Sequence, residues 1–173
     1  MQQKSNLYLV GPMGAGKTTI GRHLAKAMGY EFFDSDAVIV DNAGADIPWI
    51  FDIEGESGFR QREEQVIDQL TLKKGVVLAT GGGAILSEDN RKNLRSRGVV
   101  VYLQTSIRFQ LYRTQKDSNR PLLQQGGRKK VLTDLLALRG PLYEQTADLI
   151  VSTDKSSPKN IVQAIITFME TQP

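Results

Sequence analysis

Residues 11–18 read GPMGAGKT, a glycine-rich stretch followed by a lysine and a threonine. This spacing is typical of a loop that binds phosphate groups, because glycines let successive backbone N–H groups point at phosphate oxygens. Lys17 can then reach the β and γ phosphates, and the Thr18 hydroxyl can bind Mg²⁺. The alternative is a flexible glycine turn, but the apolar run before the loop and the amphipathic run after it favour phosphate binding. The loop predicts a nucleotide without separating a kinase from a GTPase or a motor.

An acidic pair follows the second apolar run, in the segment FDSD at 33–36. Ligands gather at the carboxyl ends of parallel strands, so Asp34 and Asp36 are candidates for holding Mg²⁺ and for accepting a proton from a substrate hydroxyl. The alternative is a helix cap with a turn acid, and Asp36 suits the cap. The spacing alone leaves both interpretations open.

Three glycines, Gly81 to Gly83, follow the third apolar run. They would let a ligand approach the backbone closely, whereas a sharp turn, the alternative, usually needs one glycine. We therefore expect a ligand contact here. No acidic residue closes this run, so Asp34 becomes the predicted carboxylate for the metal ion.

Four arginines are candidates for binding an anion. Arg60 has glutamates four residues before and after it, and this spacing alone favours a surface ion pair. Arg139 falls at the predicted end of a helix, where it could cap carbonyl groups. Arg113 and Arg120 flank a polar segment. An arginine that closes over the phosphates would offset the charge that develops during phosphoryl transfer.

The apolar runs in the sequence predict the strands and helices that position these residues. Runs without strict alternation are typical of strands buried on both faces, and they occur at 7–10, 31–33, 76–79, 99–103 and 149–151. Helical patterns lie between and after them, at 18–28, 56–74, 87–97, 129–138 and 158–170. Strands that alternate with helices predict an α/β fold with a parallel sheet.

Two segments fit that alternation less well. Residues 35–60 contain acidic and aromatic side chains and predict a small helical insertion. Residues 115–127 are polar, and a loop of this length is typically a lid, a binding loop or a disordered segment.

Length and composition bound the remaining possibilities. A chain of 173 residues with 40% hydrophobic residues predicts one globular domain, 1–173. Cysteine is absent, which excludes disulfides and thiolate chemistry, and the single histidine, His23, makes histidine catalysis unexpected. The net charge of +3 suits a small anion. We expect no nucleic-acid partner, since the cluster at 128–130 fits a solvated helix face. No membrane partner is expected, and the chain is expected to be a cytoplasmic monomer.

Taken together, the motifs resemble those of the shikimate kinase family over nearly the whole chain. They are GPMGAGKT at 11–18, FDSD at 33–36, FR at 59–60, GGG at 81–83, RPLL at 120–123 and RGPLY at 139–143. The phosphate loop alone would be generic, whereas the combination is specific. The resemblance implies ATP-dependent phosphorylation of the 3-hydroxyl of shikimate, in chorismate and aromatic amino-acid biosynthesis. It also implies a three-layer α/β/α P-loop kinase fold, with a five-stranded parallel sheet, a substrate-binding insertion at about 35–60 and a lid at about 113–127.

The resemblance also implies roles for the matching residues. Lys17, Asp36 and Arg120 would be catalytic, with Asp36 holding the acceptor hydroxyl and able to act as a base. ATP would be bound by Gly14, Ala15, Gly16, Lys17, Thr18, Thr19, Arg113 and Arg120, with adenine near residues 153–158. Shikimate would be bound by Asp36, Arg60, Gly81, Gly82 and Arg139, with both arginines on its carboxylate. Mg²⁺ would be bound by Thr18, and by Asp34 through water.

Two other functions stay open at this stage. One is a P-loop kinase for gluconate or a nucleotide, which substrate profiling would separate. The other is a nucleotide-dependent switch or binding module that is not an enzyme. Absence of the base-reading motif N-K-x-D counts against a GTPase switch.

Overall fold

The computed structural model describes residues 5–115 and 127–172. Strands and helices alternate along this part of the chain. The strands are β1 (Asn6–Val10), β2 (Glu31–Asp34), β3 (Val76–Ala79), β4 (Gly98–Gln104) and β5 (Leu149–Ser152). The helices are α1 (Lys17–Met28), α2 (Ser35–Ala43), α3 (Ile47–Thr71), the 3-10 turn η1 (Ala84–Leu86), α4 (Glu88–Arg97), α5 (Ile107–Thr114), α6 (Arg128–Thr146) and α7 (Pro158–Glu170).

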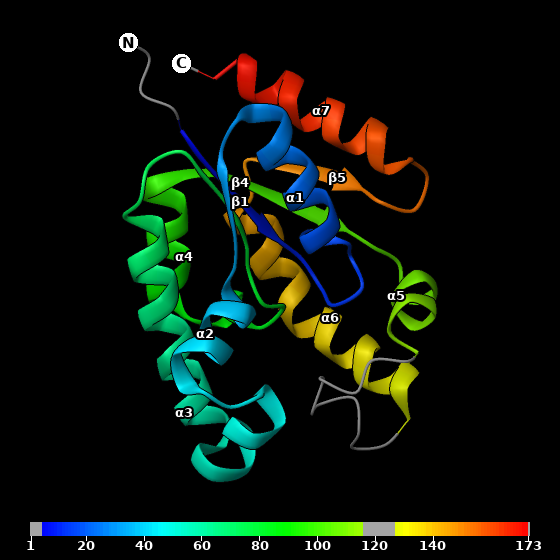
Figure 1. The fold of residues 1–173 in the computed structure, drawn as a ribbon. Coiled ribbons are helices and arrows are strands. Elements are labelled where there is room, and N and C mark those ends of the chain that lie inside the picture. The colour runs from blue at the N-terminus through cyan, green and yellow to red at the C-terminus, as the bar shows by residue number, and fades with distance from the viewer. Residues whose placement is uncertain (1–4, 116–126, 173) are drawn as a thin grey trace.

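The five strands form one parallel sheet in the order β2-β3-β1-β4-β5. Central β1 pairs with β3 on one side and with β4 on the other, so Leu7 lies opposite both Val77 and Val99. Helices cover both faces of the sheet and make three layers (Figure 1). The predicted strands, the parallel sheet and the α/β/α layers are confirmed.

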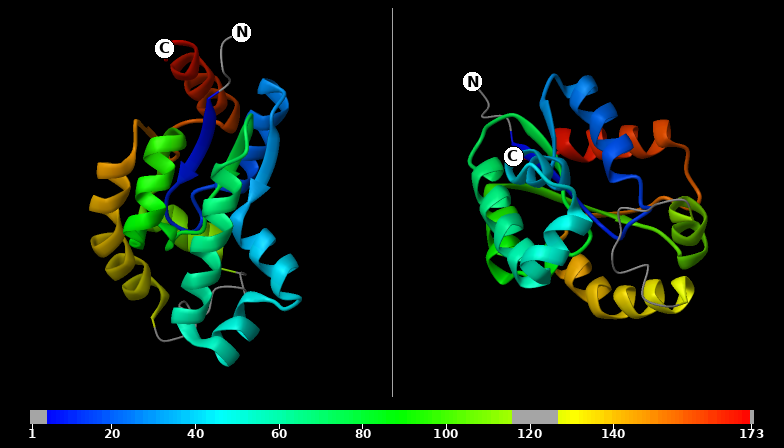
Figure 2. Two further views of the ribbon diagram at one scale, coloured as in Figure 1. Left: turned by 90° about the vertical axis from the view of Figure 1, so that its left-hand side faces the viewer. Right: turned by 60° about the horizontal axis from the view of Figure 1, so that its bottom comes forward.

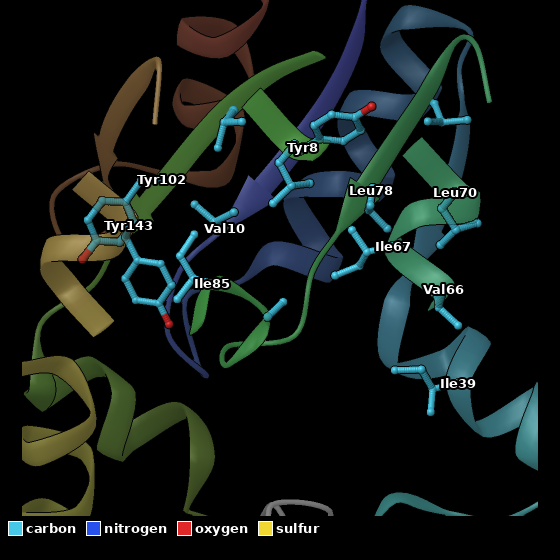
Figure 3. Close-up of a cluster of buried hydrophobic side chains, with 14 of the residues drawn as sticks. Tyr8, Val10, Ile39, Val66, Ile67, Leu70, Leu78, Ile85, Tyr102 and Tyr143 are labelled. Atoms are coloured by element: carbon cyan, nitrogen blue, oxygen red, sulfur yellow. The ribbon is translucent and has the colours of Figure 1, made fainter. Parts of the chain in front are cut away.

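Each face of the sheet has its own apolar core, because side chains alternate along β1. Leu7 and Leu9 pack with residues of α1 and α7, whereas Tyr8 and Val10 pack with residues of α3, α4 and α6. All four side chains are almost fully buried. Figure 3 shows the second core, which runs from α3 to the tyrosines of β4 and α6. Packing on both faces fixes the strands, and the loops at their carboxyl ends are held with them.

Residues 35–60 form α2 and the first part of α3. Within α3, Gly55 has φ 73° and ψ 176°, a backbone conformation that is open almost only to glycine. Arg62 spans this kink with paired hydrogen bonds to the Glu54 carboxylate at 2.7 and 2.8 Å. Figure 2 shows α2 and the start of α3 projecting beyond the sheet, at the end of the molecule opposite the termini.

Two helices depart from the prediction. Helix α5 was not predicted, and its N-cap is Ser106, whose hydroxyl accepts a hydrogen bond from Phe109 N. Helix α6 does not end near residue 138 but continues through Pro141 to Thr146. In this continuation Tyr143 is buried, and its ring packs on that of Tyr102 in β4. In the described residues, none of the helices has both the length and the apolar character needed to cross a membrane.

Candidate active site

The phosphate loop joins β1 to α1, as predicted. Gly14 and Gly16 have φ of 80° and 89°, the left-handed conformations that glycine permits. Gly16 is also the N-cap of α1, so the positive end of the helix dipole meets the loop. Lys17 Nζ donates hydrogen bonds to Gly11 O at 2.6 Å and Pro12 O at 2.9 Å. The predicted ATP-binding residues from Gly14 to Thr19 therefore form one loop and the first turn of α1.

The two aspartates of the acidic pair, Asp34 and Asp36, lie in different environments. Strand β2 ends at Asp34, whose Oδ1 accepts hydrogen bonds from the backbone N–H groups of Asp36 and Ala37 and caps α2. The suggestion that Asp36 is the cap is therefore wrong, because the N-cap is Asp34 and α2 begins at Ser35. The Thr18 hydroxyl donates to Asp34 Oδ2 at 2.7 Å, which brings the two predicted metal-binding residues together. Asp36 lies one residue into α2.

The glycine triplet connects β3 to η1 and lies against the predicted substrate residues. A methyl group on Gly81 would lie 2.7 Å from Asp36 Oδ1 and 2.9 Å from Glu63 Oε2. One on Gly82 would lie 3.5 Å from Arg139 Nη1, and one on Gly83 would lie 2.6 Å from Arg60 Nη1. The triplet therefore brings both arginines and Asp36 to one place at the carboxyl ends of β2 and β3. Side chains on Gly81 and Gly83 would collide with the groups that line it, whereas a methyl group on Gly82 would make ordinary van der Waals contact.

Arg60 has a partner that the spacing did not predict. Its guanidinium binds Glu63 at 2.8 Å, and Glu56 more weakly at 3.4 Å, rather than the expected Glu64. Glu63 is 1% exposed, so this is not simply a surface ion pair. Burial raises the pKa of Glu63 to about 7, Arg60 opposes the rise, and the nearby Asp36 adds to it.

Arg139 is buried in the interior of α6, so the suggestion that it caps a helix end is wrong. Burial lowers the pKa of its guanidinium, which nevertheless stays charged because the ordinary value is so high. Its Nε has no hydrogen-bond partner within the described residues. A buried guanidinium that still has an N–H group to donate, beside a glycine backbone, is well suited to bind an anion.

Arg113, on α5, lies beside the phosphate loop. Its Nη1 donates to Gly14 O at 2.9 Å and lies 3.5 Å from Thr153 Oγ1, the start of the predicted adenine segment. The structure thus brings Arg113 beside the loop and beside Thr153. Arg120, and most of the predicted lid at 113–127, lie outside the described residues.

Two residues of this site were missed by the sequence reasoning. Glu63 looked like one of many charged residues on a long helix, and no pattern distinguished it. Tyr143 stood in the quoted motif RGPLY without a role, yet its hydroxyl donates a hydrogen bond to Gly82 O. A tyrosine one helical turn after an arginine was the available signal.

A phosphate loop on a three-layer α/β/α fold, next to a carboxylate and two arginines, is the arrangement of a P-loop kinase. The family model described as "Shikimate kinase" matches residues 13–170. A shikimate kinase of Photobacterium profundum is 58% identical over 170 residues, which cover 98% of this chain and 97% of the relative. The chain belongs to the shikimate kinase family.

Solved structures agree with this assignment. A shikimate kinase from Acinetobacter baumannii in complex with shikimate superposes with a TM-score of 0.94 and 51% identity, covering 97% of this chain and 94% of that one. A gluconokinase from Sinorhizobium meliloti has a TM-score of 0.62 at 16% identity, covering 98% and 94%, and shares the fold alone.

Proposed function

We propose that this protein transfers the γ-phosphoryl group of ATP to the 3-hydroxyl of shikimate, forming shikimate 3-phosphate and ADP in the route to chorismate and the aromatic amino acids. The observation that carries the proposal is the position of Arg60 and Arg139 around the glycine triplet, close to the phosphate loop. Shikimate carries one carboxylate, and guanidinium groups bind carboxylates with paired hydrogen bonds.

Asp36 is the group that orients the acceptor hydroxyl and takes its proton. It lies near the space beside Gly81, while Arg60, Arg139 and the backbone of Gly81 and Gly82 bind the carboxylate end of the substrate. Fixing both ends of a rigid ring aligns its hydroxyl for in-line attack, which removes much of the entropic barrier.

The phosphate loop holds ATP and supplies positive charge. Lys17 Nζ, now bonded to the carbonyls of Gly11 and Pro12, turns toward the β and γ phosphates when nucleotide binds. Arg120 is the catalytic arginine that offsets charge on the transferring group. Arg113 is proposed to lie against the base together with residues 153–158.

Thr18 and Asp34 fit a Mg²⁺ site. Their facing oxygen atoms are the hard ligands that Mg²⁺ prefers, and a kinase site needs few protein ligands because phosphates and water supply the others. The described residues contain no group of three or more acidic or histidine side chains that could hold a metal by themselves. When bound, Mg²⁺ would neutralise phosphate oxygens, and Asp34 would act through water.

Shikimate and ATP are thus the proposed partners of a monomer, and the proposed location is the cytoplasm, where ATP is available. The test is ADP release with ATP and Mg²⁺, comparing shikimate with gluconate and a panel of nucleoside monophosphates. Release that requires shikimate is the expected result. Turnover of another acceptor with none of shikimate would overturn the substrate assignment, and ATP binding without any turnover would favour a switch.

A further inference from the structure

Tyr143 lies on α6 one helical turn after Arg139, and only 1% of it is exposed. Its ring packs on that of Tyr102, with 5.0 Å between the ring centroids. Figure 3 shows that the two hydroxyl groups point in different directions, with that of Tyr143 near Ile85. The Tyr143 hydroxyl donates a hydrogen bond to Gly82 O. Burial raises the pKa of Tyr143, against the opposing effect of Arg139, so the phenol keeps its proton and remains a donor.

The glycine triplet needs such an anchor, because glycine backbones have more conformational freedom than any other. Gly81 N donates to the Ser35 hydroxyl at 3.0 Å. Gly81 O and Gly83 O accept backbone hydrogen bonds within the η1 turn, both at 3.1 Å. Gly82 O is different, since it accepts its bond from a side chain on a helix distant in sequence. Tyr143 therefore fixes the orientation of the peptide that follows Gly82.

The same phenol also interacts with Arg139. The two side chains influence each other's pKa in opposite directions, as neighbouring acidic and basic groups do. Arg139 in turn lies against Gly82, with its Nη1 3.5 Å from where a Cβ on that glycine would be. The Tyr143 hydroxyl therefore interacts with both Gly82 O and the Arg139 guanidinium, and these two groups lie beside each other.

We propose that Tyr143 is a positioning residue for carboxylate recognition: its hydroxyl holds the Gly82 peptide and the Arg139 guanidinium in the relative geometry that a planar carboxylate requires. This inference rests on the proposed function, since it assumes that these two groups bind the shikimate carboxylate. Tyr143 itself touches no reacting atom. Its effect should therefore fall on the recognition of the acid, with little effect on ATP.

The test compares shikimate with its methyl ester, which keeps the ring hydroxyls but lacks the negative charge. Kinetic constants for both substrates, and for ATP, are measured for the wild type and for Tyr143→Phe. We expect the ratio of kcat/KM for the acid over the ester to fall about tenfold, because the hydroxyl's hydrogen bonds are lost. The KM for ATP should stay within about twofold.

Tyr8→Phe is the matched control, because Tyr8 is also fully buried. Its hydroxyl bonds Asn6, Thr71 O and Arg97 O, at the amino end of the same sheet. Both variants lose buried hydrogen bonds and some thermal stability, but only Tyr143→Phe should change the acid-to-ester ratio. An unchanged ratio in folded Tyr143→Phe would overturn the proposal.

Replacement of Tyr143 by 4-fluorophenylalanine or 4-aminophenylalanine covers the case in which phenylalanine packs too poorly to fold. The fluorine fills the space of the hydroxyl without donating, whereas the amino group can donate to Gly82 O. The ratio should fall with the fluoro group and recover with the amino group, and equal ratios for the two would reject the positioning role. A wild type that does not phosphorylate shikimate would instead refute the proposed function itself.

Discussion

Glu63 and Arg60 form an ion pair that uses only one of the two carboxylate oxygens. Glu63 Oε1 lies 2.8 Å from Arg60 Nη1, while Glu63 Oε2 has no hydrogen-bond partner in the described part of the chain. That second oxygen faces Gly81, on the side where Asp36 also lies. One buried carboxyl thus orients an arginine and places negative charge near the proposed base.

This pair predicts a distinctive dependence of stability on pH. Burial raises the pKa of Glu63 to about 7 in the folded protein, against an ordinary value of 4.5. Between these values the folded state binds more protons than the unfolded state, so this group's contribution to the free energy of unfolding falls as pH rises. The loss begins near pH 4.5 and is complete above pH 7.

Glu63→Gln removes the titrating group and keeps an oxygen for Arg60. Urea unfolding of both proteins from pH 4.5 to 8 should show the wild type losing on the order of 2 kcal/mol relative to the variant across that window. A difference that does not change with pH would contradict the raised pKa. Glu64→Gln, on the neighbouring and more exposed position, is the control and should track the wild type.

Asp36→Asn should abolish phosphoryl transfer while ATP still binds. An amide can occupy the same space but cannot take the hydroxyl proton, so we expect kcat to fall by about 10² to 10⁴. ADP release and ATP affinity are measured side by side, with Asp41→Asn, an exposed change on the same helix, as the control. Turnover close to the wild type would refute the assigned role.

The sequence predicted the strands, the phosphate loop and the position of Asp34, because each depends on local pattern or on the edge of a parallel sheet, whereas the place of Arg113 beside the loop was implied only by the family resemblance. Burial of Glu63 was not predictable in the same way. Its environment is made by Gly81, Asp36 and Arg139, which are distant in sequence, and a charged residue on a long helix is usually solvated.

Arg139 illustrates a different limit. Gly140 and Pro141 indicated a helix end, since proline removes a backbone donor and glycine lowers helix propensity. Tertiary packing overrides that preference here: Arg139 and Tyr143 are both buried, and α6 continues to Thr146. Because α6 continues, Arg139 is buried and lies in the site rather than at the surface.

Gly81→Ala tests the space beside the triplet. Gly81 does not have a positive φ, so alanine is compatible with its backbone, but the added methyl group would lie 2.7 Å from Asp36 Oδ1. Displacement of Asp36 and loss of room for substrate should raise the KM for shikimate at least about tenfold. Gly29→Ala, at the C-cap of α1, where the methyl group meets nothing within 4 Å, is the control for the KM. If both variants behave alike, Gly81 does not border the substrate.

Arg139→Ala should weaken shikimate binding far more than ATP binding. The side chain is 4% exposed and its Nε has no hydrogen-bond partner in the described residues, so this donor remains for the substrate. Removing a buried cation that pairs with a carboxylate costs about 2–5 kcal/mol, which corresponds to a rise of 30-fold or more in the KM for shikimate. Arg97→Ala is the control, because Arg97 also forms an ion pair, with Asp68 at 2.8 Å, but it ends α4 at the opposite end of the sheet. Equal losses of affinity for shikimate and ATP in Arg139→Ala would show that Arg139 supports the fold, whereas a loss confined to shikimate would establish it as a carboxylate ligand.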